Sequence, residues 1–258
     1  MKLWEDHAPR IKLDGFRAHN QYLWQPPEYP YAELLKYIRE NTDGTLLRML
    51  TEDGAFECQT ATIDGRMVSR DLLDSIIEIH FLTRDDAISK HSWLPSNARV
   101  LDIGAGYGRF AHRFLTHYHD AFVYCTDAIN VSLRVCEAYL KFRGIPNDGL
   151  VGMPCARVVD TAHLGEIGPL DLAVNIHSWP ECSPAEVKWW LDWLRERRVP
   201  RLFVVPHSPD FAFADCGEAA PGESFLPLIE EAGYKIETKW YGPDAWPRTF
   251  ALFKLEGT

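Results

Sequence analysis

The apolar residues of the chain change their spacing near residue 96, and this change divides the sequence into two parts. Before it, apolar residues recur at intervals of three and four, which is the spacing of helices with one packed face. After it, short apolar runs alternate with helical stretches, as in a sheet whose strands are joined by helices. We therefore expect a helical N-terminal part, residues 1–95, followed by an α/β domain, residues 96–258.

Two helices are predicted in the N-terminal part. Residues 31–40 carry Leu34, Leu35 and Ile38 on one stripe. Residues 70–90 carry a longer stripe, which begins after Ser69, a residue type suited to capping a helix N-terminus. No linker-like composition separates these helices from the sheet that follows, so we expect a cap packed onto the α/β domain rather than a separate domain.

The second part predicts a seven-stranded sheet. The capping box Ser183–Glu186 and the stop signal at Gly144 mark helices between the strands. The last two strands are joined by a short turn at residues 242–244, so they should pair antiparallel beside an otherwise parallel sheet. The predicted strands cover residues 99–103, 121–126, 156–159, 170–176, 201–205, 234–241 and 249–255, and the predicted helices residues 110–115, 130–142, 184–194 and 223–232.

The first strand of this sheet leads into a loop with three alternate glycines, Gly104, Gly106 and Gly108, and then into a helix. This order is that of the first unit of a nucleotide-binding sheet, in which the glycines let a ligand approach the backbone closely. Asp102 stands just before the loop. Its carboxylate would repel a pyrophosphate at the helix N-terminus and suits a cationic ligand instead.

The run Asp102-x-Gly104-x-Gly106-x-Gly108 resembles motif I of the class I S-adenosylmethionine methyltransferases. S-adenosylmethionine carries a sulfonium and an ammonium group and no phosphate, in agreement with the acidic residue. The resemblance implies a Rossmann-like class I methyltransferase fold and S-adenosylmethionine as the cofactor. It also implies cofactor contacts from Asp102, Gly104, Ala105, Gly106, Asp127, Ala128 and Asn175.

Asp127 also has an interpretation of its own, because it follows the second strand of the sheet. A carboxylate at this place accepts hydrogen bonds from both hydroxyls of a ribose. NAD contains the same ribose, so Asp127 predicts nucleoside binding without choosing the cofactor. The alternative is a carboxylate that stabilises the N-terminus of the helix at residues 130–142.

The loop Asn175–Glu181 follows the fourth strand, at the edge of the sheet where open α/β folds bind ligands. His177 is the leading candidate for a general base, because methyl transfer to an alcohol requires removal of its proton and histidine titrates near neutral pH. A hydrogen-bonded structural histidine is the alternative. Glu181 is predicted to orient His177 or to bind the acceptor, the alternative being an acidic residue before a capped helix.

Three segments together resemble the family of sugar O-methyltransferases from bacterial glycan clusters: Ser69–Ser75, the glycine loop and Asn175–Ser178. This resemblance implies methyl transfer to a sugar hydroxyl of a glycan or a glycosylated metabolite. It implies that the N-terminal part closes over the acceptor. It also implies that Arg70 holds the carboxylate of the cofactor in a bidentate pair, whereas the alternative is a surface arginine at a helix start.

Charge and composition restrict the partners. The formal net charge of −10 disfavours nucleic acid, whose phosphates require a basic surface. The six cysteines form no Cys-x-x-Cys pair, and no apolar run is long enough to span a membrane. We therefore expect a reduced, cytoplasmic protein with a small-molecule or oligosaccharide acceptor, no nucleic acid partner and no membrane span. Formation of a homo-oligomer stays open.

Other chemistry remains to be weighed. His207 and Asp210 follow the fifth strand, where Mg²⁺ would lower the pKa of an acceptor alcohol. No dense carboxylate cluster requires a metal, so we predict His177 as the base without one. A methyltransferase for another small molecule is the first alternative function. An NAD-dependent oxidoreductase is disfavoured by Asp102, by Arg109 and by the terminal hairpin, and a non-catalytic binding subunit by the intact glycine loop.

Overall fold

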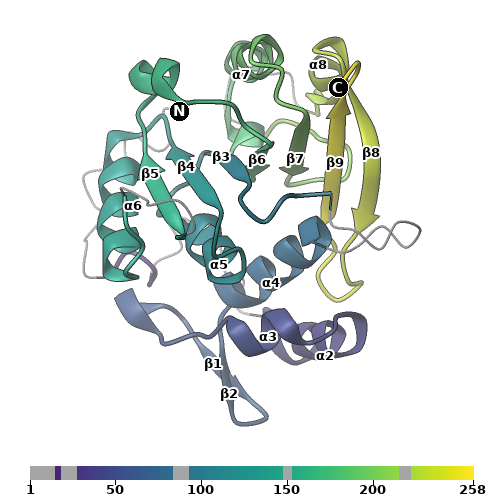
Figure 1. Cartoon of the computed structure of the whole chain (residues 1–258). Helices are drawn as coiled ribbons and strands as arrows, with labels where there is room; N and C mark the ends of the chain where they lie inside the picture. The colour runs from purple at the N-terminus through teal and green to yellow at the C-terminus, as the bar shows by residue number, and fades with distance from the viewer. Residues whose placement is uncertain (1–14, 19–27, 84–92, 148–152, 215–221) are drawn as a thin grey trace.

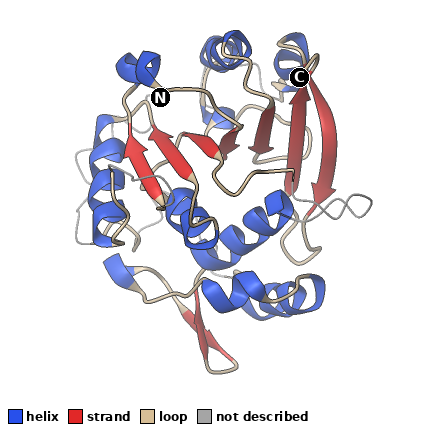
Figure 2. Cartoon of the chain, viewed as in Figure 1, coloured by secondary structure: helices blue, strands red, loops and turns tan. Residues whose placement is uncertain are grey.

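The computed structural model describes residues 15–18, 28–83, 93–147, 153–214 and 222–258. Within these ranges a seven-stranded sheet stands in the middle of the molecule, with helices on both faces (Figure 1 and Figure 2). In spatial order its strands are β5 (Cys155–Val158), β4 (Phe122–Thr126), β3 (Arg99–Ile103), β6 (Leu172–Ile176), β7 (Arg201–Val205), β9 (Thr249–Leu255) and β8 (Tyr234–Tyr241).

The pairing of these strands confirms the predicted fold class. The five strands from β5 to β7 run parallel to one another, whereas β9 is antiparallel to both β7 and β8. This is a Rossmann-like sheet with an antiparallel C-terminal hairpin. The chain builds one half outward from β3 and the other outward from β6, so these neighbours form the switch point of the topology.

A helix is present at each position where the apolar periodicity predicted one, and a further short helix, Thr45–Met49, was not predicted. The capping box at α7 is complete: the Ser183 hydroxyl accepts the N–H of Glu186, whose carboxylate accepts the N–H of Ser183 at 2.8 Å. The helices are α2 (Tyr31–Asn41), α3 (Thr45–Met49), α4 (Arg70–Thr83), α5 (Arg109–His117), α6 (Asn130–Phe142), α7 (Pro184–Glu196) and α8 (Leu226–Glu231), with the 3₁₀ helices η2 (Ala55–Glu57), η3 (Thr161–Glu166) and η4 (Trp179–Glu181).

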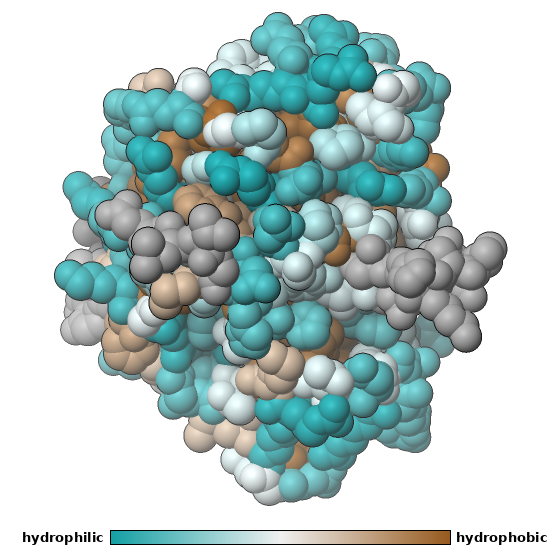
Figure 3. Space-filling view, viewed as in Figure 1, coloured by the Kyte–Doolittle hydropathy of each residue, from teal (hydrophilic) through white to brown (hydrophobic). Residues whose placement is uncertain are grey.

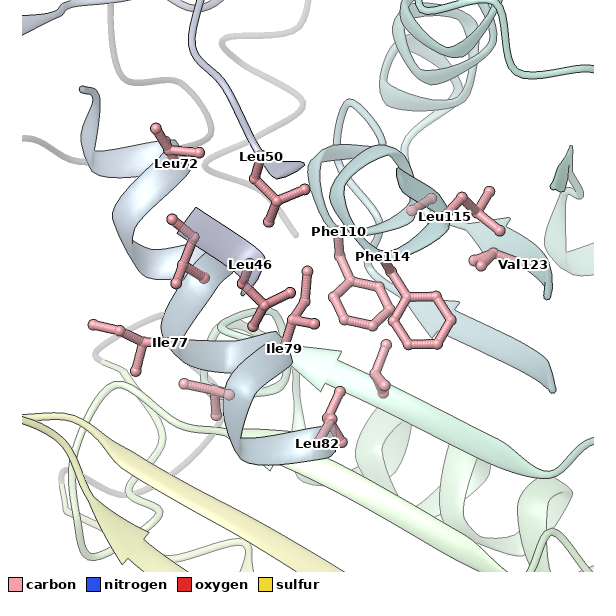
Figure 4. Close-up of a cluster of buried hydrophobic side chains, with 14 of the residues drawn as sticks. Leu46, Leu50, Leu72, Ile77, Ile79, Leu82, Phe110, Phe114, Leu115 and Val123 are labelled. Carbon is pink, nitrogen blue, oxygen red and sulfur yellow. The ribbon is translucent and has the colours of Figure 1, made fainter. Parts of the chain in front are cut away.

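Alternate residues of each central strand point to opposite faces of the sheet and build two cores. In β3, Val100 belongs to the core shared with α4, α5 and α6, whereas Leu101 belongs to the core shared with α7 and α8. Figure 4 shows side chains of α4, such as Ile79, meeting Phe110 and Phe114 of α5 in the first core. This core also contains residues of α2 and α3, so the described N-terminal residues are part of it.

Two local expectations were incomplete. A small antiparallel hairpin, β1 (Ala61–Ile63) and β2 (Arg66–Val68), stands in the N-terminal part that was predicted to be helical. Three-residue strands are too short to show an alternating pattern. The last helix begins at Leu226 instead of residue 223, because Ser224 pairs with Ala212 in an isolated bridge. The predicted continuation of the Arg70 helix beyond residue 83 lies outside the described residues.

The visible surface has little apolar area. On the face shown in Figure 3, hydrophilic residues dominate and hydrophobic ones form small separate areas, as on ordinary water-exposed surfaces. No helix in the part of the chain that the structure describes has the length and apolarity needed to cross a membrane.

Four buried charged side chains join the N-terminal part to α4 and α5. The Nη2 atom of Arg17 lies 2.9 Å from both Glu52 Oε2 and Asp71 Oδ2. Arg113 Nη2 lies 3.1 Å from Glu52 Oε2 and 3.4 Å from Asp71 Oδ1. The Tyr107 hydroxyl, from the glycine loop, donates to Asp71 as well. Two buried cations and two buried anions thus neutralise one another, because water does not reach them to solvate their charges.

Candidate functional site

A cavity lies at the switch point between β3 and β6, where open α/β sheets bind ligands. It encloses about 1140 Å³, counted with its open mouth, and we call it the larger cavity. Its walls come from the ends of β3, β4 and β6 and from η4 and α7. They consist of Asp102, Ile103, Gly104, Ala105, Gly106, Tyr107, Arg109, Phe110, Asp127, Ala128, Ile129, Ser132, Ile176, His177, Ser178, Trp179, Glu181, Cys182, Glu186 and Trp190.

The glycine loop is shaped for close approach. Gly104 has a φ of +75°, and a Cβ on it would lie 2.2 Å from Ser178 Oγ, so only glycine fits between the loop and η4. The N–H groups of Gly104 and Ala105 both donate to the Thr126 carbonyl at 2.9 Å. The loop is therefore fixed to the end of β4 and presents its inner side to the larger cavity.

Asp127 lies at the end of β4, on the wall of the larger cavity. Its two oxygens accept the N–H groups of Gly106 at 3.1 Å and Ile129 at 2.9 Å, which hold the carboxylate in place. Burial raises the pKa of Asp127 to about 6, although these two bonds oppose the shift. Each oxygen keeps a second lone pair, so the carboxylate can still accept a ligand hydroxyl. Binding of a ribose there stays a prediction.

Asp102 is a buried carboxylate in the wall of the larger cavity. Its side chain belongs to a residue that is 2% exposed, and its Oδ2 has no hydrogen-bond partner among the described residues. Burial raises the pKa of Asp102 to about 7, even though the nearby cation of Arg109 acts in the opposite direction. Arg109 itself donates to both oxygens of Glu78 at 2.7 and 3.1 Å. Asp102 therefore offers an unused acceptor to a ligand that carries a donor or a positive charge.

His177 combines an unusual backbone with an unused ring nitrogen. Its φ of +69° is in the left-handed region, which is rare for a non-glycine residue and frequent at functional sites. Its N–H donates to the Val205 carbonyl at 2.9 Å, which fixes the residue at the end of β6. Its Nδ1 is buried and finds no partner among the described residues. Burial, followed by the positive charge of Arg248, lowers the pKa of His177 well below its usual value, so the ring is neutral at pH 7.

Glu181 is placed near a second histidine. Its Oε1 lies 3.9 Å from Nε2 of His207, whose ring centroid lies 5.3 Å from that of His177. The three side chains form a row at the ends of β6 and β7. The carboxylate of Glu181 thus contacts His207, and orientation of His177 by Glu181, as the sequence suggested, stays a prediction.

Arg70 and Asn175 do not line the larger cavity, unlike the other predicted site residues. Arg70 donates from Nε to Asp74 Oδ2 at 3.1 Å, and this partner four residues along a helix was visible in the sequence. Asn175 donates to the Ile103 carbonyl at 3.0 Å and accepts the N–H of Trp179 at 3.1 Å. Asn175 therefore shapes the loop after β6 from behind, and a direct contact with a cofactor stays a prediction.

Comparisons with known proteins found partial similarity to solved structures. No family model matches the chain, and neither does any curated protein. An uncharacterized protein of Listeria monocytogenes shares 12% identity at a TM-score of 0.47, over 65% of this chain and 65% of that one. The chain thus spans under two thirds of that protein. The PH0226 protein of Pyrococcus horikoshii shares 15% sequence identity at a TM-score of 0.49, and the similarity covers 73% of this chain and 92% of that one. A SAM-dependent methyltransferase of Methanosarcina mazei shares 14% sequence identity at a TM-score of 0.47, and the similarity covers 67% of this chain and 99% of that one. The strand order of this chain itself carries the fold assignment.

A smaller cavity adjoins the larger one, and His177 lines both. It encloses about 270 Å³ with its mouth and lies between α4, the end of β7 and the turn from β8 to β9. Its other walls are Asp74, Ile77, Glu78, Val205, Pro243, Trp246, Arg248 and Phe250.

Several wall residues had not been predicted as site residues. Ser132, Glu186 and Trp190 of the larger cavity stand on helices whose apolar stripes were recognised, but the pattern did not show which faces reach the site. Arg248 lies in the hairpin turn and carries no motif. Among the described residues, no group of three or more histidine, cysteine or acidic side chains is placed to hold a metal ion.

Replacement of Asp127 by alanine should weaken the binding of S-adenosylhomocysteine by about tenfold or more, because a charge-assisted acceptor is lost. In the wild-type protein, affinity should fall as the pH is lowered through about 6, where the carboxylate takes up a proton. Calorimetry measures both effects. The exposed Asp120, changed to alanine, is the control. An unchanged dissociation constant in the Asp127 variant would leave Asp127 with a purely structural role.

Proposed function

We propose that this protein is an S-adenosylmethionine-dependent methyltransferase that methylates a hydroxyl oxygen, with a sugar as the acceptor. The observation that supports it best is the larger cavity itself. A glycine loop, a buried carboxylate with an unused oxygen at Asp102 and a second carboxylate at Asp127 meet there. A cofactor with hydroxyls and a positive charge matches this set of acceptors, and one with a pyrophosphate does not.

Each residue of the larger cavity has a separate role in this proposal. The cofactor, when bound, supplies a methyl group on a positively charged sulfur. Asp127 would accept its ribose hydroxyls, and Asp102 would favour its positive end. Gly104 and Gly106 let it lie against the backbone. In this proposal the larger cavity excludes water and aligns the methyl group with the acceptor oxygen.

His177 would act as the general base. It stands where the two cavities meet, it is neutral at pH 7, and its Nδ1 has no partner among the described residues. As the acceptor oxygen attacks the methyl carbon, Nδ1 can take the hydroxyl proton. The strained backbone of His177 supports this role, since such strain persists where function requires the side chain in one place.

Residues 1–95 are proposed to cover the acceptor. Helix α4 supplies Asp74 and Glu78 to the wall of the smaller cavity beside His177. Tyr29, also in the N-terminal part, contacts Trp246 of the wall of the smaller cavity, with ring centroids 5.0 Å apart. The N-terminal part is thus close to the place where the acceptor would meet the cofactor.

The choice of cofactor has a direct test. S-adenosylhomocysteine at a hundredfold excess over its dissociation constant should raise the melting temperature by roughly 5–10 °C, because it binds only the folded state. NAD at the same concentration should have no effect, because Arg109, the arginine among the described wall residues of the larger cavity, already pairs with Glu78 and is not free to bind the pyrophosphate. Stabilisation by NAD alone would overturn the methyltransferase assignment in favour of an oxidoreductase.

A further inference from the structure

Several buried polar groups around the smaller cavity lack a partner. Among the described residues these are Arg70 Nη1, Arg248 Nε, Trp246 Nε1 and His177 Nδ1. Buried donors without partners are costly, so such a group is rare unless a ligand or water completes it. Three of the four residues line the smaller cavity directly, and Arg70 adjoins it through Trp246.

The two arginines lie against one tryptophan. The Cζ atom of Arg248 is 4.9 Å from the ring centroid of Trp246, and the Cζ atom of Arg70 is 5.4 Å from it. The ring thereby holds both guanidinium groups in one place, in spite of their like charges. Arg70 is 4% exposed and cannot turn away into water.

The charges around the cavity do not cancel. Glu78 is engaged with Arg109 through both oxygens, and Asp74 accepts from Arg70 Nε and from the Tyr29 hydroxyl at 2.8 Å. Within the described residues, Asp74 is thus paired with Arg70 and Glu78 with Arg109, so neither carboxylate of the wall is left for Arg248 and its positive charge is in excess there. Arg248 forms no ion pair among the described residues, so the excess charge is on its side of the cavity.

We propose that the smaller cavity, which has room for a small group rather than for a whole sugar, receives a carboxylate or phosphate group of the methyl acceptor and that Arg248, with Arg70 beside it, binds this group. The proposal rests on the proposed methyl transfer and narrows its acceptor to an anionic one. One anion balances the excess charge, and its oxygens supply the acceptors that the arginine N–H groups lack. His177 lines both cavities, so the hydroxyl of an acceptor whose anionic group lies beside Arg248 would reach the cofactor next to His177.

The test is calorimetry on the protein saturated with S-adenosylhomocysteine, with three probes: glucuronate, glucose 6-phosphate and glucose. At least one charged sugar should bind about tenfold tighter than glucose or better, and the better one shows whether the group is a carboxylate or a phosphate. Arg248→Gln should remove this preference, and Arg248→Lys should keep part of it, because a lysine retains the charge without the planar fork. Lys254→Gln removes an exposed positive charge from β9, the strand that follows Arg248, and should change nothing.

Two results would overturn the anion site. The first is that neither charged sugar is preferred over glucose, including the case in which no probe binds. The second is that Arg248→Gln weakens S-adenosylhomocysteine itself about tenfold, because the cation would then serve the carboxylate of the cofactor. If the wild-type protein fails to bind S-adenosylhomocysteine, the proposed function is wrong. The same sugar titrations are then done without S-adenosylhomocysteine, and the effect of Arg248→Gln on them shows separately whether the anion site exists.

Discussion

Replacing His177 by asparagine is expected to lower kcat by roughly 10²–10⁴-fold while the affinity for S-adenosylhomocysteine stays nearly unchanged. Asparagine tolerates the left-handed backbone that His177 adopts, so the change removes the base without adding backbone strain. Turnover is measured as S-adenosylhomocysteine release with an acceptor selected from neutral and anionic sugars. Calorimetry measures cofactor binding in the same variant.

The pH dependence of this step follows from the surroundings of the ring. A histidine must be neutral to accept a proton, so kcat/KM should fall as the pH is lowered through its pKa in the free enzyme. Burial, and then the charges of Arg248 and His207, lower the pKa of His177 well below its usual value. The acidic limb of the profile should therefore lie below the pH 6–7 expected for an ordinary histidine, and it should vanish in the asparagine variant.

His207→Asn is the matched control, because this ring lies beside His177 but outside both cavity walls. It should keep most of the turnover. Wild-type turnover with an unaltered pH profile in the His177 variant would end the general-base proposal, whatever becomes of the methyltransferase assignment. If His207→Asn were instead the variant that loses activity, the base would have to be assigned to His207.

Asp71→Asn should lower the free energy of unfolding by about 3–5 kcal/mol, because it leaves two buried guanidinium groups short of a counter-ion. Asp71 is 0% exposed and pairs with Arg17 and Arg113, while Tyr107 ties it to the glycine loop. Urea unfolding measures the loss. Because the loop is attached to this network, affinity for S-adenosylhomocysteine should fall as well.

The same network predicts a loss of stability in acid. Burial by itself would raise the pKa of Asp71, but Arg17 and Arg113 outweigh it and lower the value to about 2. A carboxyl with a lowered pKa stabilises the fold above its unfolded value, near 3.9, and this contribution disappears as the pH falls from there through about 2. Asp64→Asn is the control: its pair with Arg39 is exposed and should contribute at most about 1 kcal/mol. Equal losses in both variants would contradict the special role of the buried network.

The sequence was informative wherever a few adjacent residues decide the structure. An apolar run followed by alternate glycines predicted β3, its loop and α5, because glycine is required where a side chain would strike η4. The capping box predicted the start of α7, and a short turn predicted the antiparallel hairpin. Together these elements led to the sheet and to the place of the larger cavity. The hairpin of β1 and β2 was missed because strands of three residues show no period.

The partner of each charged side chain was decided by the tertiary structure. Motif position suggested Arg70 for the cofactor, and that role stays a prediction; packing decided that its neighbours are Asp74 and Trp246. Nothing near Arg248 in the sequence indicates that it lies beside His177, since the two meet only when the last hairpin joins the sheet. Hydrophobic spacing and turn preferences act over short stretches and can be found in the sequence. Charge pairing and burial depend on which distant segments come together, so only the folded chain determines them.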